Sequence, residues 1–295
     1  MTFEITSSEK NFNFKEQNAP STSRSIMMDF TISVYGAHKL VPEEGRTVEK
    51  IMRAAAGLGF DGIDLGYYWG ENTKAQEMKD AKTLAEDLQL KLTNYICGNN
   101  FGNAIAEDRL AAEIDKVKTA LDEAAEFGCK NLRVFGGGYD LEWEKYASAI
   151  ADALGACVEH AQKNNVIMAI EDHGALCKNS SEQLFYITAV NSPFLRATCD
   201  IGNYWTHGGE LPEQGTAAIA DMAVMVHVKD YVIINNKYTS VPSGDGIIDL
   251  KQCFRILRDA DYQGTLSLEY ECSIGEGIHG ISTSLSNMRR LYAGC

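Results

Sequence analysis

Short runs rich in β-branched residues alternate with stretches of helical periodicity from residue 28 onward, and this alternation constrains the fold more than any other feature. Such alternation is typical of βα units that build a parallel sheet. Eight runs are predicted strands, covering residues 29–36, 61–66, 90–98, 131–138, 166–174, 195–203, 225–231 and 265–271. Because eight parallel strands close a (β/α)₈ TIM barrel, we predict an α/β fold with one such barrel over residues 28–295.

The stretches between the runs carry apolar residues at helical spacing. One stripe consists of Ile114, Val117, Leu121 and Ala124, and Gly128 follows where a helix C-cap is expected. Similar stripes precede the fifth and eighth predicted strands, at Tyr146, Ile150, Leu154 and Val158, and at Leu250, Cys253, Phe254 and Leu257. An outer helix of a barrel must bury one face, so we interpret these stripes as core packing.

Residues 1–27 are polar and lack periodicity, and we predict an N-terminal extension outside the barrel. The chain length of 295 residues fits one barrel of about 250 residues with an appendage. The extension either extends into solvent or packs on another surface. That surface would belong to a neighbouring subunit or to the base of the barrel.

Charge and composition exclude several classes of partner. The net charge of −14 opposes binding to a phosphate backbone, so we expect no nucleic-acid partner. No apolar run approaches the roughly 20 residues that span a bilayer, so we expect no membrane partner. The eight cysteines form no CxxC pair and no secretory signal opens the sequence, which favours reduced thiols and a cytoplasmic location.

Four potential metal ligands lie at the ends of consecutive predicted strands, where the catalytic groups of a TIM barrel project. They are Glu171, Asp200, His227 and Glu269. Three carboxylates that point at a common axis repel one another, and a divalent cation removes that repulsion. An oxygen-rich set with one imidazole suits Mn²⁺, our first expectation, or Mg²⁺ or Co²⁺.

The segments AIEDHG, CDIGN, HVKDY and SLEYE, in this order, resemble the sugar phosphate isomerase/epimerase family with its xylose-isomerase-like TIM barrel. GFDGIDLGYYW and NLRVFGGG are similar to segments in the first half of that family, so the resemblance covers residues 28–292. It implies that the four strand-end residues bind a metal and that Glu171 and Glu269 are an acid/base pair. The resemblance is incomplete, because Asn203 and Ile233 stand where free-ketose epimerases of the family carry a histidine and an arginine.

Further candidates lie close to the four ligands in sequence. Strand alternation places His173 on the same face as Glu171, and Lys229 on the same face as His227. We predict a substrate-contacting or acid/base role for His173, against an orienting role, and a substrate contact for Lys229, against a pair with Asp230 or Asp200. Other predicted substrate-binding residues are Asn203, Tyr68 and Trp205, whose alternative is loop packing.

Four functions remain as hypotheses. The leading one is a metal-dependent isomerase or epimerase that moves a proton next to the carbonyl of a sugar. The second is a subunit that cleaves C-glycosides or keto-glycosides by eliminating an aglycone. An endonuclease-like role is disfavoured by the net charge of −14 and only six histidines, and the fourth is a non-catalytic sugar-binding barrel. We expect a homo-oligomer, or for the second hypothesis a hetero-oligomer with a small subunit.

Overall fold

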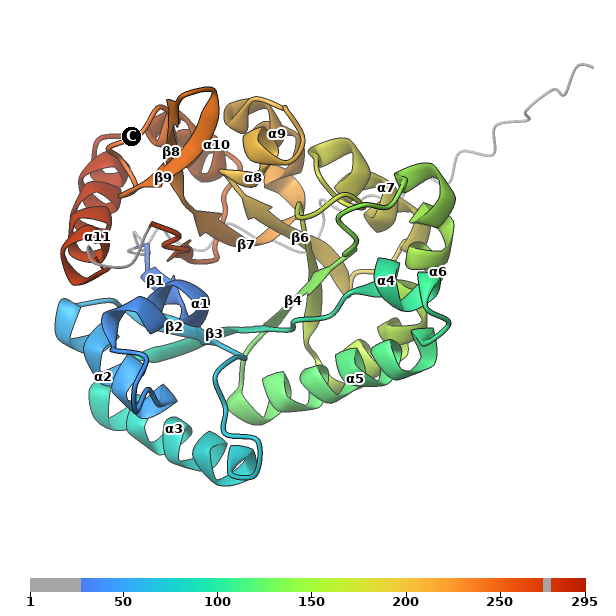
Figure 1. The fold of residues 1–295 in the computed structure, drawn as a ribbon, viewed down its shortest axis with the longest axis horizontal. Helices are drawn as coiled ribbons and strands as arrows, with labels where there is room; N and C mark the ends of the chain where they lie inside the picture. Colours follow the sequence, from blue (N-terminus) through green and yellow to red (C-terminus); the bar gives the residue numbers. More distant parts are fainter. Residues whose placement is uncertain (1–27, 273–276) are drawn as a thin grey trace, which may run out of the picture.

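A computed structural model describes residues 28–272 and 277–295. Within it, eight parallel strands close a barrel in the order β1-β10-β7-β6-β5-β4-β3-β2, which confirms the predicted TIM barrel (Figure 1). The barrel strands are β1 (Phe30–Ser33), β2 (Gly62–Leu65), β3 (Lys91–Ile96), β4 (Asn131–Phe135), β5 (Ile167–Glu171), β6 (Leu195–Asp200), β7 (Ala223–Val228) and β10 (Leu266–Leu268). The predicted N-terminal extension lies outside the described residues.

Helices follow the barrel strands and surround them in Figure 1. The longer ones are α2 (Val48–Leu58), α3 (Lys74–Leu88), α5 (Leu110–Phe127), α6 (Trp143–Asn164), α7 (Ser180–Val190), α9 (Pro212–Ile219), α10 (Leu250–Asp259) and α11 (Gly277–Ala293). Short helical segments are α1 (Val34–Ala37), η1 (His38–Leu40), α4 (Phe101–Ala106), α8 (Asn203–Thr206) and η2 (Ala220–Met222). No helix in the described part of the chain has the length and apolar character needed to cross a bilayer.

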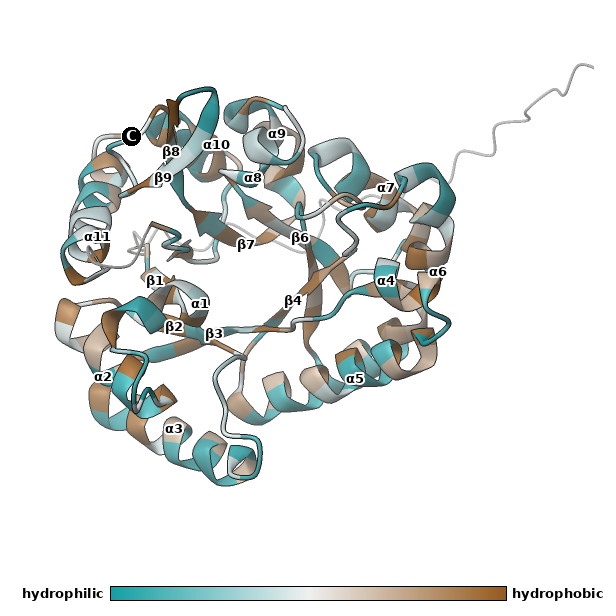
Figure 2. Ribbon diagram, in the orientation of Figure 1, coloured by the Kyte–Doolittle hydropathy of each residue, from teal (hydrophilic) through white to brown (hydrophobic). Residues whose placement is uncertain are grey.

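The predicted helical stripes pack as expected. In α5, Val117, Leu121 and Ala124 are buried, and the helix ends at Gly128, whose φ of 78° is in the left-handed region that favours glycine. All four stripe residues of α10 are buried as well. Figure 2 shows hydrophobic and hydrophilic residues alternating along these helices, as expected when one face packs on the barrel and the other faces solvent.

The barrel interior is polar, while the apolar core lies between the strands and the helices. Asp64, on β2, accepts hydrogen bonds from Asn94 on β3 (3.0 Å) and Ser267 on β10 (2.5 Å). Asn131 on β4 donates to Asn94 at 2.9 Å. Interior positions therefore support polar side chains, provided that each finds a partner inside the barrel.

Most observed strands are shorter than predicted, and three differences change the order or type of an element. The end of the first predicted strand forms α1, because Ser33 caps that helix by accepting from the backbone of Tyr35. The last barrel strand stops at Leu268, so Glu269 follows it. Beyond β7, the chain forms an antiparallel hairpin that we did not predict, made of β8 (Asp230–Ile234) and β9 (Lys237–Val241).

Candidate metal and substrate site

The four predicted ligands converge at the carboxyl ends of the strands. Glu171 is the last residue of β5, Asp200 the last of β6 and paired in register with His227 of β7, and Glu269 follows β10. One ligand atom from each lies within 4.8 Å of the others, and all four side chains are buried. Atoms that share one ion at about 2.0–2.6 Å are at most about 5 Å apart, so this separation fits a single metal.

His227 Nδ1 faces all three carboxylates. It lies 2.8 Å from Glu171 Oε1, 3.6 Å from Glu269 Oε2 and 3.9 Å from Asp200 Oδ2. Burial alone would lower the pKa of His227, but the carboxylates, Glu269 first, raise it to about 9. Burial raises the pKa of Asp200 to about 8. The cluster thus concentrates negative charge that a cation would stabilise.

Asp200 is held in place by backbone hydrogen bonds. Its Oδ1 accepts from the N–H groups of Gly202 (3.0 Å) and Asn203 (3.1 Å). The Asp200 N–H in turn donates to Asp172 Oδ1 at 2.9 Å. These contacts leave Asp200 Oδ2 facing the cluster, where it has no neutral hydrogen-bond donor.

Lys229 lies within the acidic cluster. Its Nζ is 2.8 Å from Asp200 Oδ2, 2.7 Å from Glu269 Oε2 and 2.8 Å from Glu271 Oε1. The pairing with Asp200 that we considered is therefore present, and the alternative pair with Asp230 is absent from the described contacts. The ammonium donates hydrogen bonds to Glu271 Oε1 and Asn203 Oδ1, and it forms ion pairs with Asp200 and Glu269.

Arg133 was not among the predicted site residues. It lies on β4 and is 2% exposed, with Nη1 3.0 Å from Glu171 Oε2 and Nη2 3.1 Å from the Tyr67 hydroxyl. Burial would raise the pKa of Glu171, but Arg133 and His227 hold it well below its usual range. The sequence does carry a signal, because an arginine inside a buried strand needs an acidic partner.

A cavity of about 430 Å³ opens beside the cluster. Its lining includes Tyr68 and His173 together with Glu171 and Glu269. The remaining lining residues are Tyr35, Tyr67, Arg133, Phe135, Tyr139 and Glu271. The cavity volume is typical of small-molecule sites, and aromatic rings form much of its wall.

His173 lies past the end of β5, among aromatic rings. Its ring centroid is 4.5 Å from Phe135, 5.8 Å from Tyr139 and 5.0 Å from His207. Burial lowers the pKa of His173, so its imidazole is neutral near pH 7. A neutral imidazole at a cavity wall can accept a proton or a hydrogen bond.

Three predicted substrate-binding residues are not among those that line this cavity, namely Lys229, Asn203 and Trp205. Asn203 is buried, and its Oδ1 lies 3.3 Å from Lys229 Nζ. Trp205 packs beside Tyr238 of the hairpin, with ring centroids 5.9 Å apart. In the absence of a substrate these placements favour packing for Trp205 and a contact through Lys229 for Asn203.

The triple-glycine run after β4 is explained by close packing. A Cβ at Gly137 would lie 2.1 Å from Asn100 Oδ1, and the same oxygen accepts the N–H of Gly138 at 3.0 Å. Both glycines have positive φ, 83° and 66°. The run therefore needs no substrate to account for it.

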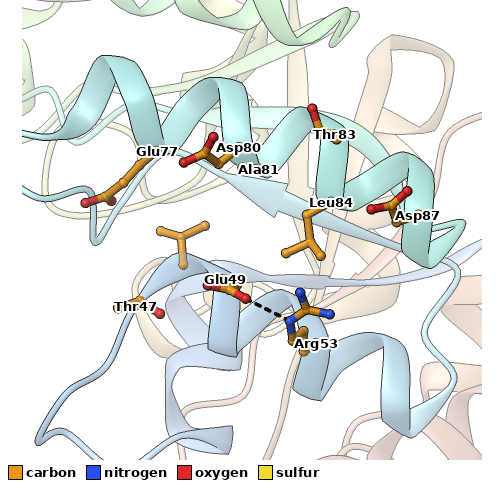
Figure 3. Close-up of a pocket in the computed structure, with 10 residues that line it drawn as sticks. Thr47, Glu49, Arg53, Glu77, Asp80, Ala81, Thr83, Leu84 and Asp87 are labelled. Atoms are coloured by element: carbon orange, nitrogen blue, oxygen red, sulfur yellow. Dashed lines mark hydrogen bonds and ion pairs between the residues drawn. The ribbon is translucent and has the colours of Figure 1, made fainter.

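A second groove, of about 450 Å³, lies outside the barrel between α2 and α3 (Figure 3). Acidic residues dominate its lining, and Arg53 pairs with Glu49 at 2.9 Å. No barrel strand end contributes to it, and we assign it no chemistry.

Comparisons with known proteins agree with the architecture. The L-ribulose-5-phosphate 3-epimerase UlaE of Escherichia coli is 27% identical over 169 residues, which cover 55% of this chain and 58% of that enzyme. Two solved structures share the fold, each with a TM-score of 0.72. One is the 3-keto-D-glucoside 4-epimerase YcjR of E. coli in its apo form, which is 19% identical and aligns over 89% of this chain and 99% of that chain. The other is the IOLI protein with a bound zinc atom, which is 15% identical and aligns over 90% of this chain and 99% of that chain. Residues 52–291 match the family described as xylose isomerase-like TIM barrel, and the chain belongs to that family.

Proposed function

We propose that the protein is a divalent-metal-dependent epimerase or isomerase that moves a proton next to the carbonyl group of a sugar. The observation that carries this proposal is the convergence of Glu171, Asp200, His227 and Glu269 within 4.8 Å beside a cavity. The relatedness to UlaE and the structural likeness to YcjR, both named as sugar epimerases, support it.

The donor set suits a hard or borderline divalent ion. Three carboxylates and one imidazole favour Mn²⁺, with Mg²⁺ or Co²⁺ as alternatives. The zinc atom named for the IOLI protein supports a metal in barrels of this architecture. When bound, the ion would polarise the carbonyl oxygen of the substrate and stabilise the negative charge of an enediolate.

We propose Glu171 and Glu269 as the acid/base pair. Glu171 ends β5 and Glu269 follows β10, two strands that β6 and β7 separate in the barrel order, and both residues line the cavity. Hydrogen bonds from His227 and Arg133 engage the two oxygens of Glu171, whereas Lys229 contacts Glu269. Burial would raise the pKa of Glu269, but Lys229 and His227 lower it to about 2. One carboxylate would accept the proton from carbon and the other would return it to the opposite face.

His173 supports a second candidate, elimination of an aglycone from an oxidised glycoside. Its neutral imidazole lines the cavity together with Phe135 and Tyr139, whose rings suit an aromatic leaving group. In that reaction His173 would remove the acidic C–H proton. In the epimerase it would orient the substrate or Glu171.

The test is hydrogen exchange in D₂O with the chelator-stripped protein and a panel of ketoses. We expect deuterium to enter the carbon next to the carbonyl only after Mn²⁺ or Co²⁺ is restored, because the carbonyl needs a Lewis acid. Full activity after exhaustive chelation, with metal content verified as nil, contradicts metal dependence. Stoichiometric sugar binding without any exchange or turnover would favour the non-catalytic barrel.

The cellular setting stays a prediction. All eight cysteines are unpaired, which supports the expected reducing cytoplasm. We predict a homo-oligomer, or a hetero-oligomer with a small subunit. Measuring the molecular mass of the purified protein in solution tests this prediction.

A further inference from the structure

We infer that this site selects an uncharged sugar or glycoside and rejects a sugar phosphate. The inference rests on the proposed function and names its substrate class. UlaE is named for a phosphate ester, whereas YcjR is named for a keto-glucoside without one. We choose between these two classes of substrate by asking which groups the cations and the backbone amides near the site already contact.

The two cations at the centre of the site are already paired. Lys229 Nζ contacts three carboxylates within 2.8 Å. Arg133 donates to Glu171 and Tyr67, and its guanidinium lies 3.9 Å from the centroid of the Phe135 ring. Both side chains are 2% exposed. Arg133 Nε has no hydrogen-bond partner among the described residues, but both cations are already paired with carboxylates, so neither offers a phosphate an uncompensated positive charge.

The charge of the site balances without an anionic substrate. Metal ligands must be deprotonated, so with one divalent ion bound His227 would be neutral and Glu171, Asp200, Glu269 and Glu271 would carry four negative charges, which Lys229, Arg133 and the ion would neutralise. A phosphate dianion would add two uncompensated charges next to carboxylates. Repulsion at such short range is costly in a partly buried site.

A carboxylate occupies the backbone amides of one loop that often binds phosphate in TIM barrels, the loop after the seventh strand. TIM barrels often bind phosphate with the loops after the seventh and eighth strands. Here, after β7, the N–H groups of Gly244 and Gly246 both donate to Asp230 Oδ2 at 2.9 Å. Asp230 Oδ1 accepts further N–H groups from Tyr231 (2.9 Å) and Ile248 (3.2 Å). Within the described residues, the Asp230 carboxylate therefore takes the amides that the loop after β7 would offer to a phosphate.

Cations near β1 are engaged as well. Lys39 Nζ donates to the backbone carbonyl of Cys272 at 2.7 Å, and Arg46 donates to the carbonyl of Val41 at 3.2 Å. Neither residue lines the cavity. Among the described residues, the cavity lining thus combines aromatic rings and carboxylates with one buried, paired cation, Arg133.

The experiment compares matched ketoses, each free and as its terminal phosphate ester, with the Mn²⁺-loaded protein. Binding is measured by calorimetry and proton transfer by deuterium exchange. We expect kcat/KM and affinity to favour the free sugars by at least about tenfold, the effect of about 1.4 kcal/mol of repulsion. Preference for the esters with exchange intact overturns the inference and leaves the proposed function standing. Binding of free sugars without exchange supports the inference and contradicts the epimerase. Failure of both series to bind contradicts both.

A charge variant tests the physical cause. Glu271→Gln removes one negative charge while its amide oxygen can still accept from Lys229, so the ratio of kcat/KM for ester over free sugar should rise about tenfold. Glu271→Asp keeps the charge and is the matched control, for which the ratio should stay near that of the parent protein. An unchanged ratio in Glu271→Gln, with exchange on free sugars still measurable, overturns the electrostatic explanation.

Discussion

Replacing Arg133 with methionine tests whether a buried ion pair holds Glu171 in place. The guanidinium and the carboxylate are 2% and 1% exposed and 3.0 Å apart, so the substitution leaves a buried charge without one of its partners. Breaking such a pair typically costs about 3–5 kcal/mol. For a chain of this size about 2–4 °C corresponds to each kcal/mol, so the Tm of the metal-free protein should fall by about 6 °C or more.

The matched control is Arg196→Met on β6. Arg196 is half-buried and donates to the backbone carbonyls of Ser192 and Leu195 at 2.9 Å, without a carboxylate partner. Losing these neutral hydrogen bonds costs about 1 kcal/mol each. The assay is thermal unfolding of both variants, with and without Mn²⁺. The deficit of Arg133→Met should shrink when the ion compensates Glu171. Equal Tm losses for the two variants in the metal-free protein would refute the reasoning.

Three further substitutions separate roles within the site. His173→Ala should lower turnover of a ketose by about 10- to 100-fold while the metal stays bound, because a loss of this size is typical of a missing orienting partner. A loss of turnover near 10⁴-fold on an oxidised aryl glycoside would instead favour elimination. Tyr139 lines the cavity and is 65% exposed, so Tyr139→Ala should raise KM by about fivefold because the substrate loses contact with the ring. Trp205→Ala should leave KM unchanged. A rise in KM for Trp205→Ala and none for Tyr139→Ala would place the substrate beside the hairpin. Asp230→Asn should lower the free energy of unfolding in urea by about 2–4 kcal/mol, because it disrupts two of the four hydrogen bonds that the side chain accepts from backbone N–H groups. An unaltered unfolding midpoint would show that these hydrogen bonds do not hold the loop after β7.

The sequence predicted the barrel and the convergence of its four strand-end residues because both depend on local pattern. Each barrel strand is a short run with its own alternation, and the carboxyl end of every parallel strand lies at one end of the barrel. Glu171, Asp200, His227 and Glu269 could therefore be placed together without knowing any contact. The confirmed C-cap at Gly128 has the same origin, since a helix end depends on neighbouring residues.

The contacts of the site could not be predicted, since they depend on side chains from distant strands. Arg133 reaches Glu171 across adjacent strands, and Lys229 reaches Glu271 across 42 residues of sequence. Asn131, Arg133 and Phe135 alternate on β4 in the way an inward-facing row does, which is the signal that would have indicated Arg133. The hairpin of β8 and β9 was missed because its first strand, which starts at Asp230, follows β7 almost without a break.

The most direct measurement of the central claim is a calorimetric titration of the chelator-stripped protein with Mn²⁺. The account predicts one saturable site per chain in the parent protein and in Asp221→Asn, which changes an exposed carboxylate outside the cluster. It predicts loss of that site in Asp200→Asn and His227→Ala, provided that both variants retain the circular dichroism of the parent. The claim that these four strand-end residues hold one divalent ion would be contradicted if the parent protein bound no Mn²⁺. It would also be contradicted if both cluster variants bound Mn²⁺ as the parent protein does.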